Sequence, residues 1–227
     1  MANGGFIRTC FLLALLFLAA QQAWLAAPLR AEIVDRIVAV VDGRVITWSS
    51  ALAEANYQAF RDGREPLRTL EGKNLEKVVS QMIDRELIEK EKEISLFTPP
   101  DNQAANRALE EIRKQFSNQE AYQKALGRYG LTEEELVQHL TQESSIMAFI
   151  DYRLHPQVRL SGDMVETYYR DTLLPQLREQ GQSEVPSLAG VRGQIEQVLV
   201  QQEINRLLDA WVQDLRKRAE IRMLTKG

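Results

Sequence analysis

Two histidines and one cysteine are the side chains of this chain best suited to metal or nucleophilic chemistry. By its pattern, His139 falls within a helix among polar neighbours, and His155 precedes Pro156 where a helix should end. Neither has a second ligand at a spacing such as His-Glu-x-x-His, so we interpret both as surface or capping residues. Cys10 has no partner elsewhere in the chain, which leaves no pair for a disulfide.

The carboxylates and glycines offer little further chemistry. Glu133, Glu134 and Glu135 are consecutive, so they point in different directions at a helix start, where capping and the helix dipole explain them. Asp42-Gly43 is a hairpin signal, and Gly190-x-x-Gly193 falls in the first turns of a helix, so neither indicates a phosphate-binding loop. We therefore predict no catalytic residue, no metal ligand and no cofactor, and we do not expect an enzyme.

The chain is better supplied with methionine and aromatic side chains on short helices. At helical spacing such residues often form a core, but clefts that they line can accept varied apolar segments, because methionine repacks and aromatic rings give large contact areas. Both interpretations stay open for each residue. The predicted peptide-binding residues are Tyr57, Phe60, Met82, Phe116, Tyr122, Tyr129, Met147, Phe149, Tyr168 and Tyr169.

The N-terminus has the order of a secretory signal peptide. Arg8 precedes an uninterrupted apolar run, Cys10–Ala20, and small residues follow as far as Ala31. The run is short for a spanning helix. We expect residues 1–31 to be removed and residues 32–227 to form the mature domain, with retention of the segment as a membrane anchor as the alternative.

Strand patterns lie close to both ends of the mature chain. The β-branched runs Ile33–Val41 and Arg44–Thr47 flank Asp42-Gly43, which predicts a hairpin with a type I′ turn. Ala219–Leu224 alternates like a strand, and a two-stranded sheet is marginal alone. We therefore predict that this last segment pairs with the hairpin as a third strand.

Helical periodicity covers most of the chain between these strands. The longest stretch, Leu188–Ala219, carries an apolar stripe over about 45 Å. We predict a mostly α fold, a multi-helix bundle around this long C-terminal helix, with a small antiparallel sheet. Within the helix that follows Thr132, Met147 is expected to face inward with Leu140 and Ile150. The other expected helices are Ser50–Arg61, Glu71–Ile94, Gln103–Phe116, Gln119–Tyr129, Thr132–Leu154 and one capped by Ser161.

Several of these segments, in this order, resemble the SurA-type periplasmic chaperones. The resemblance implies a helical cradle, without cofactor, that holds unfolded exported polypeptide in the periplasm, with outer-membrane proteins as expected clients. The segments that carry it are Ile33–Ser50, Lys77–Glu91, Leu131–Leu136, Ser161–Tyr169 and Leu207–Leu224.

The resemblance breaks off at one place. In that family, the helix similar to Ser161–Tyr169 leads into a parvulin-type prolyl isomerase domain, which needs on the order of a hundred residues. Here only residues 170–187 separate Tyr169 from Leu188. Isomerase activity is therefore not carried over to this chain.

Three functional hypotheses follow. The first is an ATP-independent holdase that binds unfolded polypeptide through an apolar cleft. The second is a structural adaptor that binds one folded partner in the cell envelope, and the third is a folding factor anchored in the inner membrane. Loss of Arg8 and Arg30 would take the net charge from −4 to −6, which disfavours a nucleic-acid partner.

Overall fold

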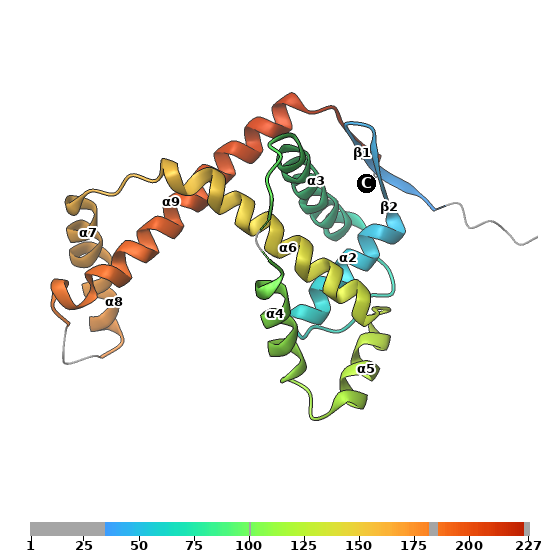
Figure 1. The fold of residues 1–227 in the computed structure, drawn as a ribbon, viewed down its shortest axis with the longest axis horizontal. Coiled ribbons are helices and arrows are strands. Elements are labelled where there is room, and N and C mark those ends of the chain that lie inside the picture. Colours follow the sequence, from blue (N-terminus) through green and yellow to red (C-terminus); the bar gives the residue numbers. More distant parts are fainter. Residues whose placement is uncertain (1–34, 100, 182–185, 225–227) are drawn as a thin grey trace, which may run out of the picture. The chain divides into compact units, whose positions relative to one another are not determined.

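The structure is a computed structural model that describes residues 35–99, 101–181 and 186–224. By its internal contacts the chain divides into Met1–Asp35 and Arg36–Gly227, and every element below belongs to the second unit (Figure 1). The predicted signal peptide, residues 1–31, lies outside the described residues. Within the described ranges, no helix is both long and apolar enough to cross a membrane. The elements are β1 (Ile37–Val41), β2 (Arg44–Thr47), α2 (Trp48–Arg61), α3 (Gly72–Ile94), α4 (Gln103–Arg113), α5 (Gln119–Arg128), α6 (Glu133–Leu154), the 3₁₀ turn η2 (His155–Gln157), α7 (Gly162–Tyr168), the π-helical turn η3 (Tyr169–Leu173), α8 (Leu174–Glu179), α9 (Leu188–Arg218) and β3 (Ile221–Met223).

The small sheet joins the hairpin to the last strand, in the order β2-β1-β3. Both neighbours of β1 are antiparallel to it, and Val41 pairs with Arg44 on one side and Ile221 on the other. Asp42 and Gly43 have φ values of 46° and 83°, as a type I′ turn requires. The predicted hairpin and the predicted third strand are both confirmed.

Asp42 also fastens the turn to the neighbouring elements. Its backbone N–H donates to the carbonyl of Glu220 (2.9 Å), and its carboxylate accepts from the backbone N–H of Glu220 (2.8 Å) and from Lys90 Nζ (2.7 Å). The hydrogen bond from Lys90, with that from Glu220, lowers the pKa of Asp42. One turn residue thus links β3 and α3 to the hairpin.

Substitution of Gly43 tests the hairpin turn. Gly43→Ala should lower the free energy of unfolding by about 1 kcal/mol, because an L side chain at a left-handed φ is strained whatever space surrounds it. Gly127→Ala is the control: Gly127 lies in α5, and a Cβ there would meet no atom within 4 Å, so stability should rise. Urea denaturation of both variants measures the difference, and equal shifts would contradict the assigned turn.

Side-chain caps mark several of the helix starts, as the sequence indicates. Thr47 caps α2, and Ser50 completes a capping box. Thr132 and Glu135 form the predicted capping box at the start of α6, and the hydroxyl of Ser161 accepts from the backbone N–H of Met164 to cap α7. These hydrogen bonds satisfy backbone groups that a helix end otherwise leaves unpaired.

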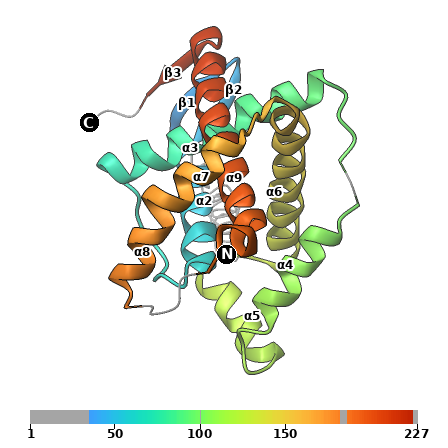
Figure 2. The ribbon, with the colours of Figure 1, turned by 90° about the vertical axis from the view of Figure 1, so that its left-hand side faces the viewer.

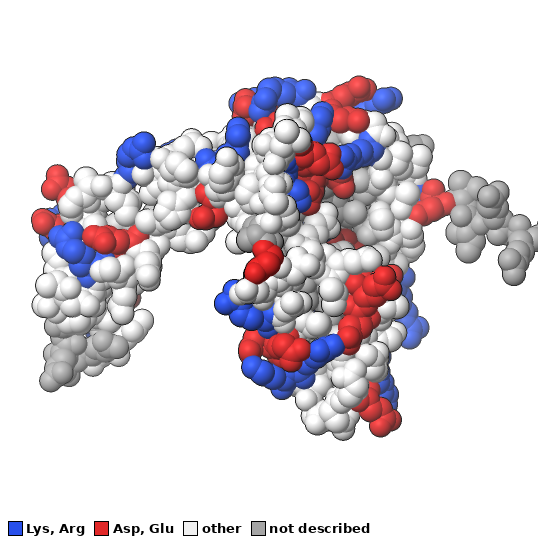
Figure 3. Space-filling view, in the orientation of Figure 1, with Lys and Arg blue, Asp and Glu red and all other residues white. Residues whose placement is uncertain are grey.

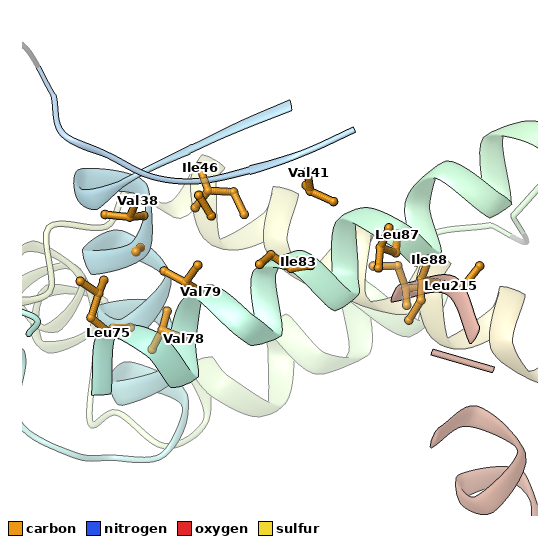
Figure 4. Packing of buried hydrophobic residues seen from close by; sticks show 14 of the residues in the cluster. Val38, Val41, Ile46, Leu75, Val78, Val79, Ile83, Leu87, Ile88 and Leu215 are labelled. Atoms are coloured by element: carbon orange, nitrogen blue, oxygen red, sulfur yellow. The ribbon is translucent and has the colours of Figure 1, made fainter. Parts of the chain in front are cut away.

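The main core lies between the sheet and the helices α3, α6 and α9. Side chains of β1 and β2 point towards α3, where Val79 and Ile83 meet them (Figure 4). The C-terminal half of α9 closes this core with Ile204 and Leu215. An ion pair between Arg216 and Asp84 fastens α9 to α3. The sequence prediction of a mostly α fold with a long C-terminal helix and a small antiparallel sheet is confirmed.

Two smaller cores flank the main one. The first half of α6 packs with α2, α4 and α5 around buried residues that include Leu136 and Leu140. The third core holds three buried residues, Val165 of α7 with Ile195 and Leu199 of α9. Figure 2 shows α7 against the N-terminal part of α9. Different lengths of α6 and α9 therefore serve different cores.

This division explains one wrong expectation. Met147 was expected to face inward, but its side chain is 64% exposed. It lies where α6 passes from the core around Leu140 to the core around Ile150, and no single inward face continues through that point. Ile94, the last residue of α3, is also strongly exposed, at 67%.

Candidate functional site

Five of the predicted peptide-binding residues come together as a core. Tyr57 and Tyr122 are each 1% exposed, and Phe60 is also buried. The ring of Phe60 lies 6.2 Å from Phe116 and 5.4 Å from Tyr129, and Phe116 lies 5.6 Å from Tyr122, measured between ring centroids. This cluster holds α2, α4, α5 and α6 together and presents little aromatic surface to a ligand.

The other five predicted residues are dispersed. Phe149 is 1% exposed and lies in the main core, and Met82 is half-buried and packs against that core. Tyr168 and Tyr169 lie half-buried on the small core of α7 and α9, where Tyr168 also lines a hollow of about 390 Å³. Met147 is the most exposed member of the predicted set.

Met147 lines a groove of about 810 Å³ along α6. Thr141, Ser145 and Ala148 follow one another at helical spacing on the α6 side of this groove. Its other side comes from the connection between α3 and α4 and from the first turn of α4. We call this feature the α6 groove; it is lined by Lys92, Pro99, Asp101, Asn102, Ala104, Val137, Gln138, Thr141, Gln142, Glu143, Ser144, Ser145, Met147 and Ala148.

Apolar side chains gather beside one end of the α6 groove. Tyr152 lies one helical turn beyond Ala148, and the half-buried Phe97 ring lies 5.3 Å from the rings of both Tyr152 and Phe149. Leu96, next to Phe97, is 87% exposed. Among the described residues, the large hydrophobic side chains more than 60% exposed are Ile94, Leu96, Met147 and Tyr152. Of these, Met147 lines the α6 groove, whereas Ile94 lines two hollows beside the hairpin turn.

Two of the three charged residues that line the α6 groove, Lys92 and Glu143, are paired with opposite charges, whereas Asp101 accepts hydrogen bonds from Gln103 and forms no ion pair with another described residue. Lys92 Nζ lies 2.5 Å from a Glu89 carboxylate oxygen and donates to Ser145 Oγ (3.0 Å), and Glu143 accepts from Arg61 (2.9 Å). In Figure 3 the connection after α3 and the adjoining part of α6 are largely uncharged. A charged ligand would have to compete with these internal ion pairs, so the site favours an uncharged one.

The α6 side of the groove also carries free hydrogen-bonding side chains. Within the part of the chain that the structure describes, no hydrogen bond engages the side chains of Gln138, Thr141 or Gln142. Amide and hydroxyl groups can each donate and accept. The α6 groove therefore joins apolar walls to neutral polar groups, which together suit an extended polypeptide backbone with apolar side chains.

The two histidines have structural contacts instead of ligands. His139, expected on the surface, is half-buried, and its ring stacks on Tyr57 at 4.2 Å with an interplanar angle of 13°. Burial raises the pKa of Tyr57 above its ordinary value, so its phenol stays neutral while its oxygen accepts from Arg61 (2.7 Å). His155 is exposed at the end of α6, beside Asp151. Among the described residues, no three His, Cys, Asp or Glu side chains gather in a way that could hold a metal ion.

The α6 groove was not predicted, apart from Met147. Leu96 and Phe97 stand just before Thr98-Pro99, so the sequence there indicates only the end of a helix. Their exposure could not be read from spacing, because it depends on where the connection to α4 runs. The one local signal for this site was that two apolar residues, Leu96 and Phe97, stand in a segment where a helix ends.

Comparison with curated proteins finds a similarity over part of the chain. No family model matches the chain. The match to a curated protein runs over an alignment of 165 residues and covers 68% of this chain and 37% of that protein, so the chain spans little more than a third of that protein's length. Over that stretch the chain is 30% identical, and thus similar, to "Chaperone SurA" of Chromobacterium violaceum.

Proposed function

We propose that this protein is an ATP-independent chaperone that binds unfolded polypeptide in the α6 groove. The observation that carries the proposal is the groove itself: its charged residues Lys92 and Glu143 are paired internally, most of its other polar groups are neutral, and the strongly exposed Met147 lies on its wall. The similarity to a chaperone supports the same assignment.

Binding would act by mass action. A client whose apolar segments are held in the groove contributes less to the free pool that aggregates. A volume of about 810 Å³ accommodates a few residues of an extended chain, and such short contacts dissociate without an energy source. The free amides of Gln138 and Gln142 would bind peptide backbone, which every client sequence carries.

The compartment and clients belong to the proposal as well. The apolar run Cys10–Ala20 favours export, and the SurA resemblance favours the periplasm and outer-membrane proteins as clients. The proposal includes no enzymatic step, because residues 170–187 are too few for an isomerase domain. Proline isomerisation of a model peptide well above background would overturn that part.

A charge placed in the α6 groove tests the site. Ala148→Glu should weaken the suppression of aggregation of a urea-denatured outer-membrane β-barrel protein. The molar excess needed to halve the aggregation should rise about fivefold or more, because an unpaired carboxylate beneath an apolar segment costs on the order of 1–3 kcal/mol. Light scattering after dilution from urea measures the effect.

The matched control is Ala210→Glu, the same change at an exposed position of α9 away from the groove. It should leave the suppression of aggregation unchanged. Equal behaviour of the two variants would exclude the α6 groove as the binding site. Failure of the unmodified protein to suppress aggregation at several-fold excess would remove the holdase function altogether.

A further inference from the structure

Leu96 has a backbone conformation that leucine rarely adopts. Its φ is 52°, and the other non-glycine residue with positive φ in the described ranges is Asp42, in the hairpin turn. Glycine usually occupies such a position after a helix, because a Cβ in the left-handed region is strained. Nothing about the turn itself therefore calls for leucine.

The turn that carries Leu96 is nevertheless well fixed. Its backbone N–H donates to the carbonyl of Glu93 (3.2 Å), and that of Phe97 donates to the carbonyl of Lys92 (3.4 Å), which is the pattern of a Schellman helix end. The Ser95 hydroxyl also donates to the Lys92 carbonyl (2.8 Å). Phe97 then packs between Phe149 and Tyr152.

The side chain of Leu96 is not buried in the protein, so packing does not offset the strain of its backbone. It is 87% exposed, more than any other large hydrophobic residue described. In a buried leucine, packing would offset the cost of backbone strain, whereas Leu96 is both strained and exposed. Strained residues that the surrounding structure holds firmly tend to mark binding sites.

We infer that Leu96 is the principal apolar anchor for an uncharged, apolar segment of unfolded polypeptide entering the α6 groove, an inference that rests on the proposed function. The internal pairing of Lys92 and Glu143 argues for this occupant over an acidic or basic one. Leu96 does not itself line the groove but lies in the chain between Lys92 and Pro99, which do, and the adjoining Phe97 packs on Tyr152, one helical turn beyond the groove residue Ala148. Because the backbone of this turn is already fixed by hydrogen bonds, it loses little conformational entropy on binding, which favours affinity.

Leu96→Gly distinguishes a role in peptide binding from a role in stability, because the substitution should weaken binding and raise stability. Glycine relieves the backbone strain, so the urea midpoint should rise. The dissociation constant for a fluorescently labelled, uncharged synthetic peptide with leucine at alternate positions should rise about tenfold. Leu96→Asn, which tolerates the same φ but is polar, should weaken binding similarly. Fluorescence anisotropy measures the peptide affinity.

Leu67→Ala is the control, since Leu67 is an exposed leucine on the connection between α2 and α3, whereas Leu96 lies between Lys92 and Pro99, which line the groove. It should bind the peptide as the unmodified protein does. A Leu96→Gly protein that is more stable and binds equally well would overturn the anchoring role while leaving the proposed function intact. If the unmodified protein neither binds the peptide nor suppresses aggregation, the proposed function and the inference both fail.

Discussion

Replacing Phe149 with alanine is expected to lower the free energy of unfolding by about 4 kcal/mol, the loss typical of removing a buried aromatic ring. Phe149 is 1% exposed, and its ring lies 5.3 Å from Phe97 and 6.0 Å from Trp211. The ring thus joins α6 to α9 and to the connection that forms one side of the α6 groove. Urea denaturation followed by circular dichroism measures the loss.

The Phe149 substitution also decides between two roles for this residue. If Phe149 is part of the core, Phe149→Leu should cost less than about 1.5 kcal/mol, because leucine keeps most of the apolar volume. If it binds clients directly, as the sequence suggested, Phe149→Ala should weaken binding without loss of stability. That second result would contradict the packing described here.

Replacing Arg85 with alanine should lower the free energy of unfolding by about 3 kcal/mol at neutral pH, because it leaves a buried carboxylate unpaired. Arg85 donates two hydrogen bonds to Glu54, of 2.7 and 2.8 Å, and Glu54 is 3% exposed. Burial by itself would raise the pKa of Glu54. The hydrogen bonds and charge of Arg85, with a hydrogen bond from Gln58, outweigh burial and lower this pKa below its ordinary value.

The loss of stability caused by Arg85→Ala should be larger at neutral pH than in acid. In the unmodified protein the lowered pKa contributes stability above the unfolded value of 4.5, and this contribution disappears as the pH falls through the folded pKa. In Arg85→Ala, burial raises the pKa of Glu54, so the carboxyl group is neutral in acid and no longer destabilises the fold there. The difference in stability between the two proteins should therefore be large at neutral pH and shrink in acid.

Two further variants complete the test of this pair. Arg206→Ala breaks an exposed ion pair with Glu203 and should change stability little. The double variant Glu54→Leu with Arg85→Met replaces both charges by apolar side chains and should recover most of the loss. A loss that is the same at every pH, or that the double variant does not recover, would show that Glu54 is not buried as a charged group.

Local signals predicted the elements and their pairing. Asp42-Gly43 between β-branched runs specifies a turn that few other sequences accept, and Thr132 with Glu135 marks a helix start within one residue. The third strand followed from a physical requirement, since a lone hairpin is marginal. Such features depend on neighbours in the chain and can be read without knowing the tertiary structure.

The candidate site depended on tertiary arrangement and was largely missed. Spacing cannot distinguish an aromatic ring in a core from one in a cleft, so Tyr57 and Tyr122 stood in the same predicted set as Met147. His139 was assigned to the surface because its partner Tyr57 is remote in sequence. Leu96 stands out only when its φ and its exposure are both known.

Site-directed photo-crosslinking tests the binding of unfolded polypeptide in the α6 groove most directly. A photoreactive amino acid would replace Gln138 in the groove, or Ala210 on α9, in the full-length protein. The proteins would be irradiated during dilution of a urea-denatured outer-membrane β-barrel client. We expect a covalent client adduct from position 138 and none above background from position 210. Adducts of equal yield at both positions, or from position 210 alone, would contradict a binding site in the α6 groove.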